Sequence, residues 1–573
     1  MKIDWQGTLR ARIYPRLTML YGSEHGERAW NLIAPLFSHY APIFEVQQNL
    51  GSGWSERDVV LITYGDQVSR ANEAPIATQH KFLHSSGLGA LINTVHFLPF
   101  YPHSSDDGFS VVDYKAVNPE WGSWNDVVNI GHEFRLMFDY VVNHISKQSE
   151  WFQSYLKGIP PYTDFFVEAD PSLDLSAVLR PRSLPLLTPF ETSRGTRHLW
   201  TTFSDDQVDL NFSEPAVLAA MIDVLLFYLT QGARLLRLDA VNYVWKEIGT
   251  SCTHLPQAHE IVKVVRDICD WFAPGTVVVS ETNVPHQDNI SYFGDGDEVH
   301  MVYNFSLPPL LFEAFLSSST DILRTWAKKV CVTHTGTTFF NFTASHDGIG
   351  VRGAQGYIEG ERFDRMISAV KSQGGQVSTR RTPEGTDVPY EMNISYFDAL
   401  AGAPGEFAPE LQVRRFLMSQ AFALSLRGIP GVYFHSLFGT RNHTRGVELT
   451  GRARSINRRK FELDELNAML DEPETQHRAV FEGYKKLLGC RVTTPAFNPD
   501  APQEILDFGD DAVIGVLRGT ASERVFCVYN FAPTTKTISL PKGSYESLTE
   551  ASHSIVGESV TLEPYGFRWL RVA

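Results

Sequence analysis

Four groups of polar side chains each follow a short apolar block, and their residue types suit acid–base chemistry. They are Asp139-Tyr-Val-Val-Asn143-His144, Arg237-Leu238-Asp239, Glu281 and His346-Asp347. Cleavage of a glycosidic bond with retention needs one carboxylate that attacks the anomeric carbon and a protonated carboxyl about 5–5.5 Å away that releases the leaving oxygen. One carboxylate after a strand is often only a helix cap, but the set predicts Asp239 as nucleophile and Glu281 as general acid/base.

The surroundings of these two carboxyl groups separate their roles. Arg237 lies two residues before Asp239, hence on the same face of an extended strand, and its charge is expected to keep that carboxylate ionised. Glu281 follows the apolar run Val277–Val279, and apolar surroundings raise a carboxyl pKa toward the value that a general acid needs.

Such residues must be positioned by neighbouring strands, and the sequence contains eight suitable apolar blocks separated by helix-length segments. This alternation predicts a parallel sheet closed as a (β/α)8 barrel, in which functional groups lie at the carboxyl ends of the strands. The predicted strands are Val59–Thr63, Thr94–Leu98, Leu136–Val142, Leu235–Leu238, Val277–Ser280, Met301–Phe305, Phe339–Phe342 and Gly431–Phe434.

The rest of the chain divides around this barrel. Residues 1–57 show helical spacing and are expected to form an N-terminal helical segment. The barrel is expected over 58–490, with a subdomain inserted at about 146–225, where the third and fourth strands are too far apart for one crossover helix and 180–189 is rich in proline. Short β blocks separated by turn residues predict a C-terminal antiparallel β domain over 491–573.

Composition excludes several classes of function. The net charge of -16 argues against a nucleic-acid partner. No apolar run approaches the roughly 20 residues of a membrane span, and the N-terminus lacks an apolar signal core, so a cytoplasmic location without membrane contact is expected. The five cysteines, Cys331 among them, form no CxxC pair and indicate neither a disulfide framework nor a zinc site.

The four motifs, in this order at these barrel positions, resemble the α-amylase family of glycoside hydrolases, glycoside hydrolase family 13. The resemblance runs from about residue 58 to the C-terminus. It implies that Asp347 stabilises the transition state beside Asp239 and Glu281. It also implies that the sugar in subsite −1 is contacted by Arg237, His144 and His346.

Further motifs resemble the sucrose phosphorylase branch of that family: Ser105-Asp-Asp-Gly-Phe109, Thr201-Thr-Phe-Ser-Asp-Asp-Gln207, Ala240-Val-Asn-Tyr243, Lys246-Glu-Ile-Gly-Thr-Ser-Cys252 and His346-Asp-Gly-Ile-Gly350. The resemblance implies that Asp106 and Arg454 hold the far hydroxyls of glucose, and that Phe109 and Phe203 form apolar walls. Gln207 and Tyr243 complete the expected substrate site. Some family members carry structural calcium but sucrose phosphorylases generally do not, so neither a metal nor a cofactor is expected.

A phosphorylase must present cationic and hydroxyl donors to the incoming phosphate. The resemblance assigns this role to Arg182 in the proline-rich loop and to Tyr390 in a second loop, Asp387-Val-Pro-Tyr-Glu391. The expected partners are therefore a small α-glucoside and inorganic phosphate, with α-glucose 1-phosphate as product. The chain is compatible with a monomer or a homodimer.

The leaving group is predicted from the acceptor side, which is more similar to the phosphorylases of glucosylglycerol and glucosylglycerate than to those of sucrose. A glycerate carboxylate wants a dedicated cation, whereas glycerol needs only neutral partners. Glycerol is favoured because Asn242, Asn283, Gln287 and Glu391 are neutral or negative.

Other activities stay open. Glycerate is the alternative if Arg180, Arg352, Arg380 or Arg381 points inward, and a sucrose phosphorylase, an α-glucoside hydrolase and a catalytically silent sugar-binding barrel remain further alternatives.

Overall fold

Eight parallel strands form a closed barrel at the centre of the molecule. The computed structural model describes residues 5–44, 53–330, 334–382, 385–403, 405–550 and 554–572, so Cys331 and part of the N-terminal segment lie outside the described residues. The strands follow one another in chain order around the barrel. They are β1 (Val60–Thr63), β3 (Thr94–Phe97), β4 (Arg135–Val141), β9 (Ala233–Asp239), β10 (Val277–Ser280), β11 (Met301–Tyr303), β12 (Thr338–Phe342) and β16 (Ile429–Tyr433).

The predicted barrel is confirmed, and each of the eight apolar blocks is one of its strands, with ends displaced by at most two residues. The blocks were recognisable because a parallel strand in a barrel is covered on both faces, by the interior and by the outer helices, and so has few polar positions. In β1, β3, β10 and β12 every residue is buried.

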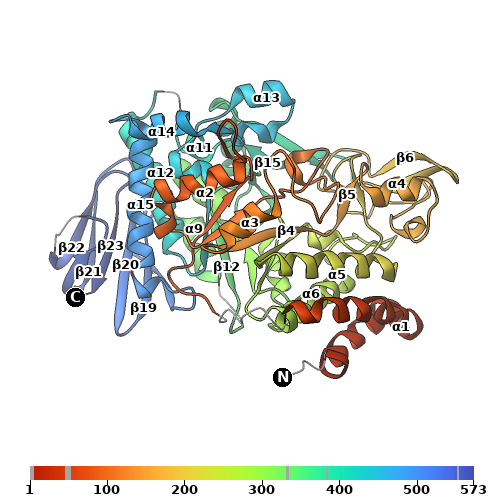
Figure 1. Ribbon diagram of the computed structural model, residues 1–573. Coiled ribbons are helices and arrows are strands. Elements are labelled where there is room, and N and C mark those ends of the chain that lie inside the picture. The colour runs from red at the N-terminus through yellow and green to blue at the C-terminus, as the bar shows by residue number, and fades with distance from the viewer. Residues whose placement is uncertain are drawn as a thin grey trace.

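Helices cover the outside of the barrel (Figure 1). Among the described α-helices, five have proline in the first turn, where a backbone N–H would have no partner within the helix. Outside the N-terminal segment and the two insertions described below, the α-helices of the described residues are α2 (Pro75–Ser85), α3 (Trp124–Gly131), α5 (Pro215–Thr230), α6 (Pro256–Phe272), α7 (His286–Ile290), α8 (Leu307–Ser317), α9 (Asp321–Lys329), α12 (Pro409–Ser425), α13 (Thr444–Thr450), α14 (Leu463–Asp471) and α15 (Gln476–Val492). A two-stranded parallel pair, β2 (Val68–Ser69) and β17 (Phe461–Glu462), joins distant parts of the chain.

The predicted subdomain is inserted after the third barrel strand. It contains β5 (His144–Ser146), α4 (Glu150–Leu156), the hairpin of β6 (Leu187–Thr192) and β7 (Gly195–Trp200), and β8 (Gln207–Asp209). β5 pairs with β8, which fixes His144 opposite Asp209. The insertion therefore brings the 201–209 segment back to the end of β4.

A second insertion follows the seventh barrel strand. Residues 387–391 were expected to form a loop, but they lie on a strand of this insertion. β13 (Ile349–Gly350), β15 (Asp387–Asn393) and β14 (Gln376–Arg381) form a three-stranded antiparallel sheet, accompanied by α10 (Gly360–Ser372) and α11 (Tyr396–Ala399). Pro389 lies at the register shift between Ser378 and Thr379, where a missing N–H is tolerated. Tyr390 and Glu391 are thus held on a strand.

The ends of the chain pack against the barrel from two sides. After a short π-helical segment (Trp5–Leu9), α1 (Arg10–Phe44) bends at Gly22, whose φ is 75°, and packs against α5 and α6. Among the described residues, no helix is long and apolar enough to span a membrane.

The C-terminal antiparallel sheet is also confirmed and lies beside α15 (Figure 1). Its strands are β18 (Gln503–Asp507), β19 (Val513–Thr520), β20 (Glu523–Asn530), β21 (Lys536–Ser547), β22 (Ser554–Leu562) and β23 (Phe567–Val572). The buried Arg518 ties the sheet to the barrel helices by donating to the Ser425 carbonyl at 2.8 Å.

Candidate active site

One pocket at the carboxyl ends of the barrel strands brings together the predicted catalytic, sugar-binding and acceptor residues, with the exception of Gln287. Its wall contains Asp106, Phe109, His144, Arg182, Phe203, Gln207, Arg237, Asp239, Asn242, Tyr243, Glu281, Asn283, His346, Asp347, Tyr390, Glu391 and Arg454. Ala240, Phe305 and Gly348 line it as well and were not predicted. Phe305 could have been found, because it ends the sixth apolar block.

Register places the two predicted catalytic carboxyls side by side. Asp239 is the last residue of β9, and Glu281 directly follows β10. Ser280 pairs with Leu238 across these strands, and the Glu281 backbone N–H donates to the Leu238 carbonyl at 3.1 Å. Glu281 Oε2 in turn accepts from the backbone N–H of Ala240 at 3.1 Å.

Arg237 forms the electrostatic centre of the site. Its Nη1 contacts Asp239 Oδ1 at 2.7 Å and also binds Asp139, while its Nη2 lies 3.8 Å from Glu281 Oε2. Asp139 is held from the other side by His96 at 2.7 Å. The guanidinium is fixed in place by these carboxylates, and it bridges the predicted nucleophile and acid/base.

The pKa values of the two carboxyls follow from burial and from this arginine. Burial raises the pKa of Glu281 to about 7; Arg237 opposes the rise, and the charge of Asp239 adds to it. Burial also raises the pKa of Asp239 to about 6, against the charge of Arg237. As predicted, the pKa of Glu281 is higher than that of Asp239. The pKa of Asp239 nevertheless lies above its usual range, because desolvation outweighs the charge of Arg237, which Asp139 and Glu281 share.

Asp347 is in a different environment from the other two. Burial would raise its pKa, but the charges of Arg454, Arg458 and Arg237 outweigh that effect and lower it. Arg454 Nη1 lies 2.5 Å from Asp347 Oδ1. Asp347 is therefore an ionised carboxylate beside a site in which Glu281 is readily protonated.

The structure gives Arg454 partners that the sequence did not indicate. Besides Asp347, it holds both oxygens of Glu391, with Nε to Oε1 at 3.0 Å and Nη2 to Oε2 at 2.6 Å. Arg458, which the sequence analysis did not select, pairs with Asp107 and lies 3.8 Å from Asp106. The sequence feature that could have identified Arg458 is its position four residues after Arg454.

The two histidines of the pocket are neutral and ordered by packing. Burial lowers the pKa of both His144 and His346. His346 stacks on Phe109 with ring centroids 4.7 Å apart, and within the described part of the chain its Nδ1 is buried without a hydrogen-bond partner. His144 Nε2 lies 3.0 Å from the Phe109 carbonyl oxygen and 3.3 Å from the amide of Gln207.

The side of the pocket expected to hold the acceptor is more cationic than the sequence analysis assumed. The charge of Glu391 is paired with Arg454, and Gln287 is exposed on α7 and lies outside the pocket wall. Arg182 lines the wall with its guanidinium 5.5 Å from the ring centre of Tyr390. The preference for glycerol rested on neutral or negative groups on this side of the pocket. Two of those four groups, Glu391 and Gln287, do not act there as assumed, so that preference is no longer supported.

Asn242 and Asn283 occupy the same side of the pocket. The amide of Asn242 donates to Thr253 Oγ1 at 2.8 Å, so part of its hydrogen-bonding capacity is already used. Asn283 packs directly on Gly350, where an added Cβ would lie 2.3 Å from its Nδ2. Glycine at 350 is thus required for this position of Asn283.

Fold and pocket define a carbohydrate-active barrel enzyme with paired acidic groups at the carboxyl ends of its strands. Residues 80–351 match the model of the α-amylase catalytic domain. A glucosylglycerate phosphorylase of Spirochaeta thermophila is 45% identical over 97% of this chain and 95% of its own. The chain therefore belongs to the α-amylase family, in its sucrose phosphorylase branch, and is a glycosyltransferase of the phosphorylase type.

Two further comparisons place the chain within that branch. The glucosylglycerol phosphorylase of Marinobacter adhaerens is 28% identical over 77% of this chain and 88% of its own. The crystal structure of a sucrose 6F-phosphate phosphorylase from Thermoanaerobacter thermosaccharolyticum has a TM-score of 0.72 at 25% identity, covering 83% of this chain and 94% of that one. The chain is thus more similar to the glucosylglycerate phosphorylase than to the glucosylglycerol phosphorylase.

Proposed function

We propose that this protein is a retaining glucosylglycerate phosphorylase, which exchanges glycerate for inorganic phosphate on an α-glucosyl unit. Two observations support the proposal: the similarity to a glucosylglycerate phosphorylase over nearly the whole chain, and the guanidinium of Arg182 in the pocket wall on the acceptor side.

The first displacement uses the two buried carboxyls. The carboxylate of Asp239 attacks the anomeric carbon, and Glu281 gives its proton to the departing glycerate oxygen, so that a covalent glucosyl-enzyme forms. The pKa of about 7 keeps much of Glu281 protonated near neutral pH, as this step requires. Asp347, ionised by its arginine neighbours, stabilises the positive charge that develops on the sugar.

In the second displacement phosphate attacks the same carbon from the side that glycerate has left. Glu281, now ionised, accepts the phosphate proton, Asp239 leaves as a carboxylate, and α-glucose 1-phosphate is released. His144 and His346 contact the sugar as neutral hydrogen-bonding groups, and Phe109 and Phe203 form the apolar walls.

Both acceptors of such an enzyme, phosphate and glycerate, are anions, so one cationic subsite suits both. Arg182 supplies the charge in the pocket wall, and Tyr390 beneath it supplies a hydroxyl. Glycerol would leave this charge without a partner, which is costly in a partly buried site.

None of the four arginines considered for glycerate is part of the described pocket wall, but the charge of Arg352 acts on Tyr243, which is part of it. Arg352 is buried, its Nε has no hydrogen-bond partner within the described ranges, and its charge opposes the rise in pKa that burial imposes on the pocket-lining Tyr243. Arg381, by contrast, is engaged by both oxygens of Asp387 at 2.7 and 3.0 Å.

The test is the release of inorganic phosphate from α-glucose 1-phosphate with glycerate, glycerol, fructose or no acceptor. We expect glycerate to give the highest kcat/KM. Arg352→Gln should lower the preference for glycerate over glycerol while retaining turnover with phosphate. Higher kcat/KM with glycerol than with glycerate in the wild type would refute the assignment, and equal release without acceptor would identify water as the real partner.

A further inference from the structure

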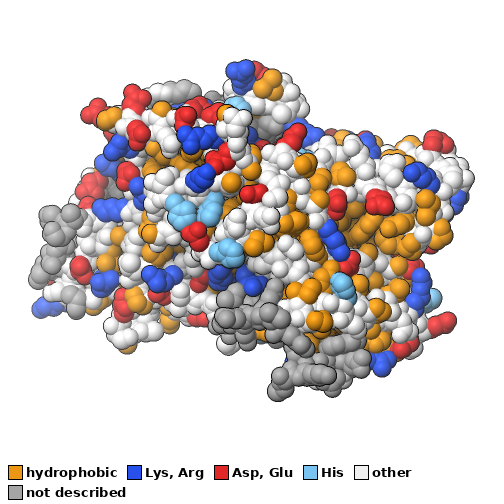
Figure 2. Space-filling model, in the orientation of Figure 1, with side chains coloured by type: hydrophobic (Ala, Val, Ile, Leu, Met, Phe, Trp, Pro, Cys, Tyr) orange, Lys and Arg blue, Asp and Glu red, His pale blue; other side chains and the backbone are white. Residues whose placement is uncertain are grey.

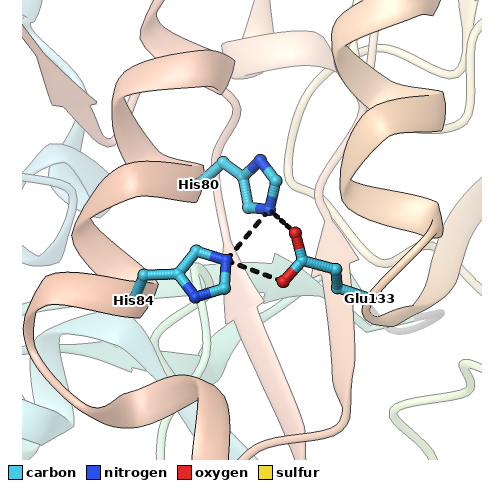
Figure 3. A group of neighbouring side chains, drawn as sticks. All are labelled: His80, His84 and Glu133. Carbon is cyan, nitrogen blue, oxygen red and sulfur yellow. Dashed lines mark hydrogen bonds and ion pairs between the residues drawn. The ribbon is translucent and has the colours of Figure 1, made fainter.

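A second cluster of reactive side chains lies on the outer surface, away from the pocket. His80 and His84 are four residues apart on α2 and therefore point from the same face of the helix. Glu133 follows the end of α3, just before β4. The two imidazoles and the carboxylate point toward one another (Figure 3). None of the three lines the pocket.

The distances within this cluster are close to those between ligands of one metal ion. His80 Nε2 lies 3.1 Å from Glu133 Oε1, His84 Nε2 lies 2.8 Å from Glu133 Oε2, and the two Nε2 atoms are 3.3 Å apart. Ligand atoms about 2.0–2.1 Å from a tetrahedral zinc ion are separated by about 3.3 Å. An ion at the centre of the three side chains would therefore require only small side-chain movements.

Packing holds the two rings in this orientation. Each imidazole lies 6.3 Å from the ring of Phe134, which is buried beneath them. His80 Nε2 and His84 Nε2 both turn toward the carboxylate, and His84 and Glu133 are about half exposed, so that an ion can enter from solvent. Histidine and acidic side chains gather on this face over α2 and α3 (Figure 2).

We propose that His80, His84 and Glu133 bind one divalent transition-metal ion of the zinc type. Two imidazoles and one carboxylate form a ligand set that zinc accepts, and magnesium or calcium would instead require oxygen ligands. The remaining coordination positions face solvent. The ion would join α2 to the segment between α3 and β4, and its role would be structural, because the cluster is separate from the reacting groups.

A metal site at this place was not expected, because the cysteine spacing alone indicates none. The sequence feature that was not used is the pair of histidines at helical spacing on α2, which becomes informative only when Glu133 is brought opposite. Without a metal ion the same side chains form two surface histidine–glutamate contacts, which contribute little to stability.

The experiment is titration of chelator-stripped full-length protein with zinc chloride, followed by calorimetry and thermal denaturation. The chain has 19 histidines, so the wild type is compared with His84→Asn and Glu133→Gln. We expect each variant to bind zinc at this site more than about 100-fold more weakly, since even outer-shell partners change metal affinity 10- to 100-fold. Zinc should raise the melting temperature of the wild type but not that of His84→Asn or Glu133→Gln.

Two controls make the result interpretable. His132→Asn changes an exposed neighbouring histidine outside the cluster and should bind zinc like the wild type. Cobalt chloride should give a visible absorption band with the wild type and with His132→Asn that is missing from His84→Asn. Equal zinc affinity and equal thermal shifts in the wild type and His84→Asn would overturn the proposal, and phosphorolysis by each variant reports that it has folded.

Discussion

The raised pKa values of Asp239 and Glu281 predict a narrow pH optimum for the first displacement. The nucleophile must be ionised, so activity is lost as pH falls through about 6. The acid must be protonated, so activity is lost as pH rises through about 7. Because each charge shifts the pKa of the other group, the two limbs belong to the pair, and activity should fall about tenfold per pH unit beyond either limb.

The assay is the pH dependence of kcat/KM for glucosylglycerate at saturating phosphate, compared with that for α-glucosyl fluoride. Fluoride leaves without a proton, so the alkaline limb near pH 7 should appear with the natural glucoside and disappear with the fluoride. The acid limb near pH 6 should remain with both, because both substrates need the carboxylate of Asp239.

The variant Glu281→Gln provides the matched control. It should lower kcat/KM for glucosylglycerate by about 10²- to 10⁴-fold and for the fluoride far less. An alkaline limb that persists with the fluoride, or equal losses on both substrates in Glu281→Gln, would refute the role of Glu281 and the physical argument from burial.

Three further predictions concern single side chains of the pocket. Asp239→Asn should lower kcat by at least about 10⁴-fold while the sugar still binds, measured by single-turnover kinetics and glucose titration; a variant that still turns over at an appreciable rate would remove the nucleophile assignment. Arg182→Ala should lower kcat/KM for phosphate by about 10- to 150-fold, the worth of a charge-assisted hydrogen bond, with slow hydrolysis less affected; a proportionate fall in both rates would contradict a phosphate contact. Gly350→Ala should displace Asn283 and raise KM for glycerate while fluoride hydrolysis continues, and an unchanged KM would show that Asn283 does not touch the acceptor.

The barrel could be predicted because its strands are buried on both faces and therefore consist mostly of apolar residues. β10, for example, is Val277–Ser280, buried at all four positions, and sequence alone located both of its ends. The sheet that carries Tyr390 could not be predicted in the same way. β14 and β15 are only partly buried and include charged residues and a proline, so their pairing depends on a partner strand and not on an apolar pattern.

The pocket residues could be named from motifs, but their ion pairs could not. Arg454 and Glu391 are 63 residues apart, and nothing in either segment indicates that one neutralises the other. This contact pairs the negative charge of Glu391, which the argument for glycerol had counted as available. The same holds for Arg458, whose partner Asp107 is 351 residues away.

The sequence by itself determined the fold class, the order of the barrel strands and the set of side chains that meet at their carboxyl ends. Strands buried on both faces can be recognised from their apolar residues, and in a parallel barrel the residues that follow each strand lie at the same end. The tertiary structure decided which charges remain available. Burial raised the pKa of Asp239 despite Arg237 beside it, Arg454 took up the charge of Glu391, and α2 and α3 brought His80 and His84 to Glu133. Desolvation and ion pairing depend on neighbours that are distant in the chain, and only folding brings those neighbours together.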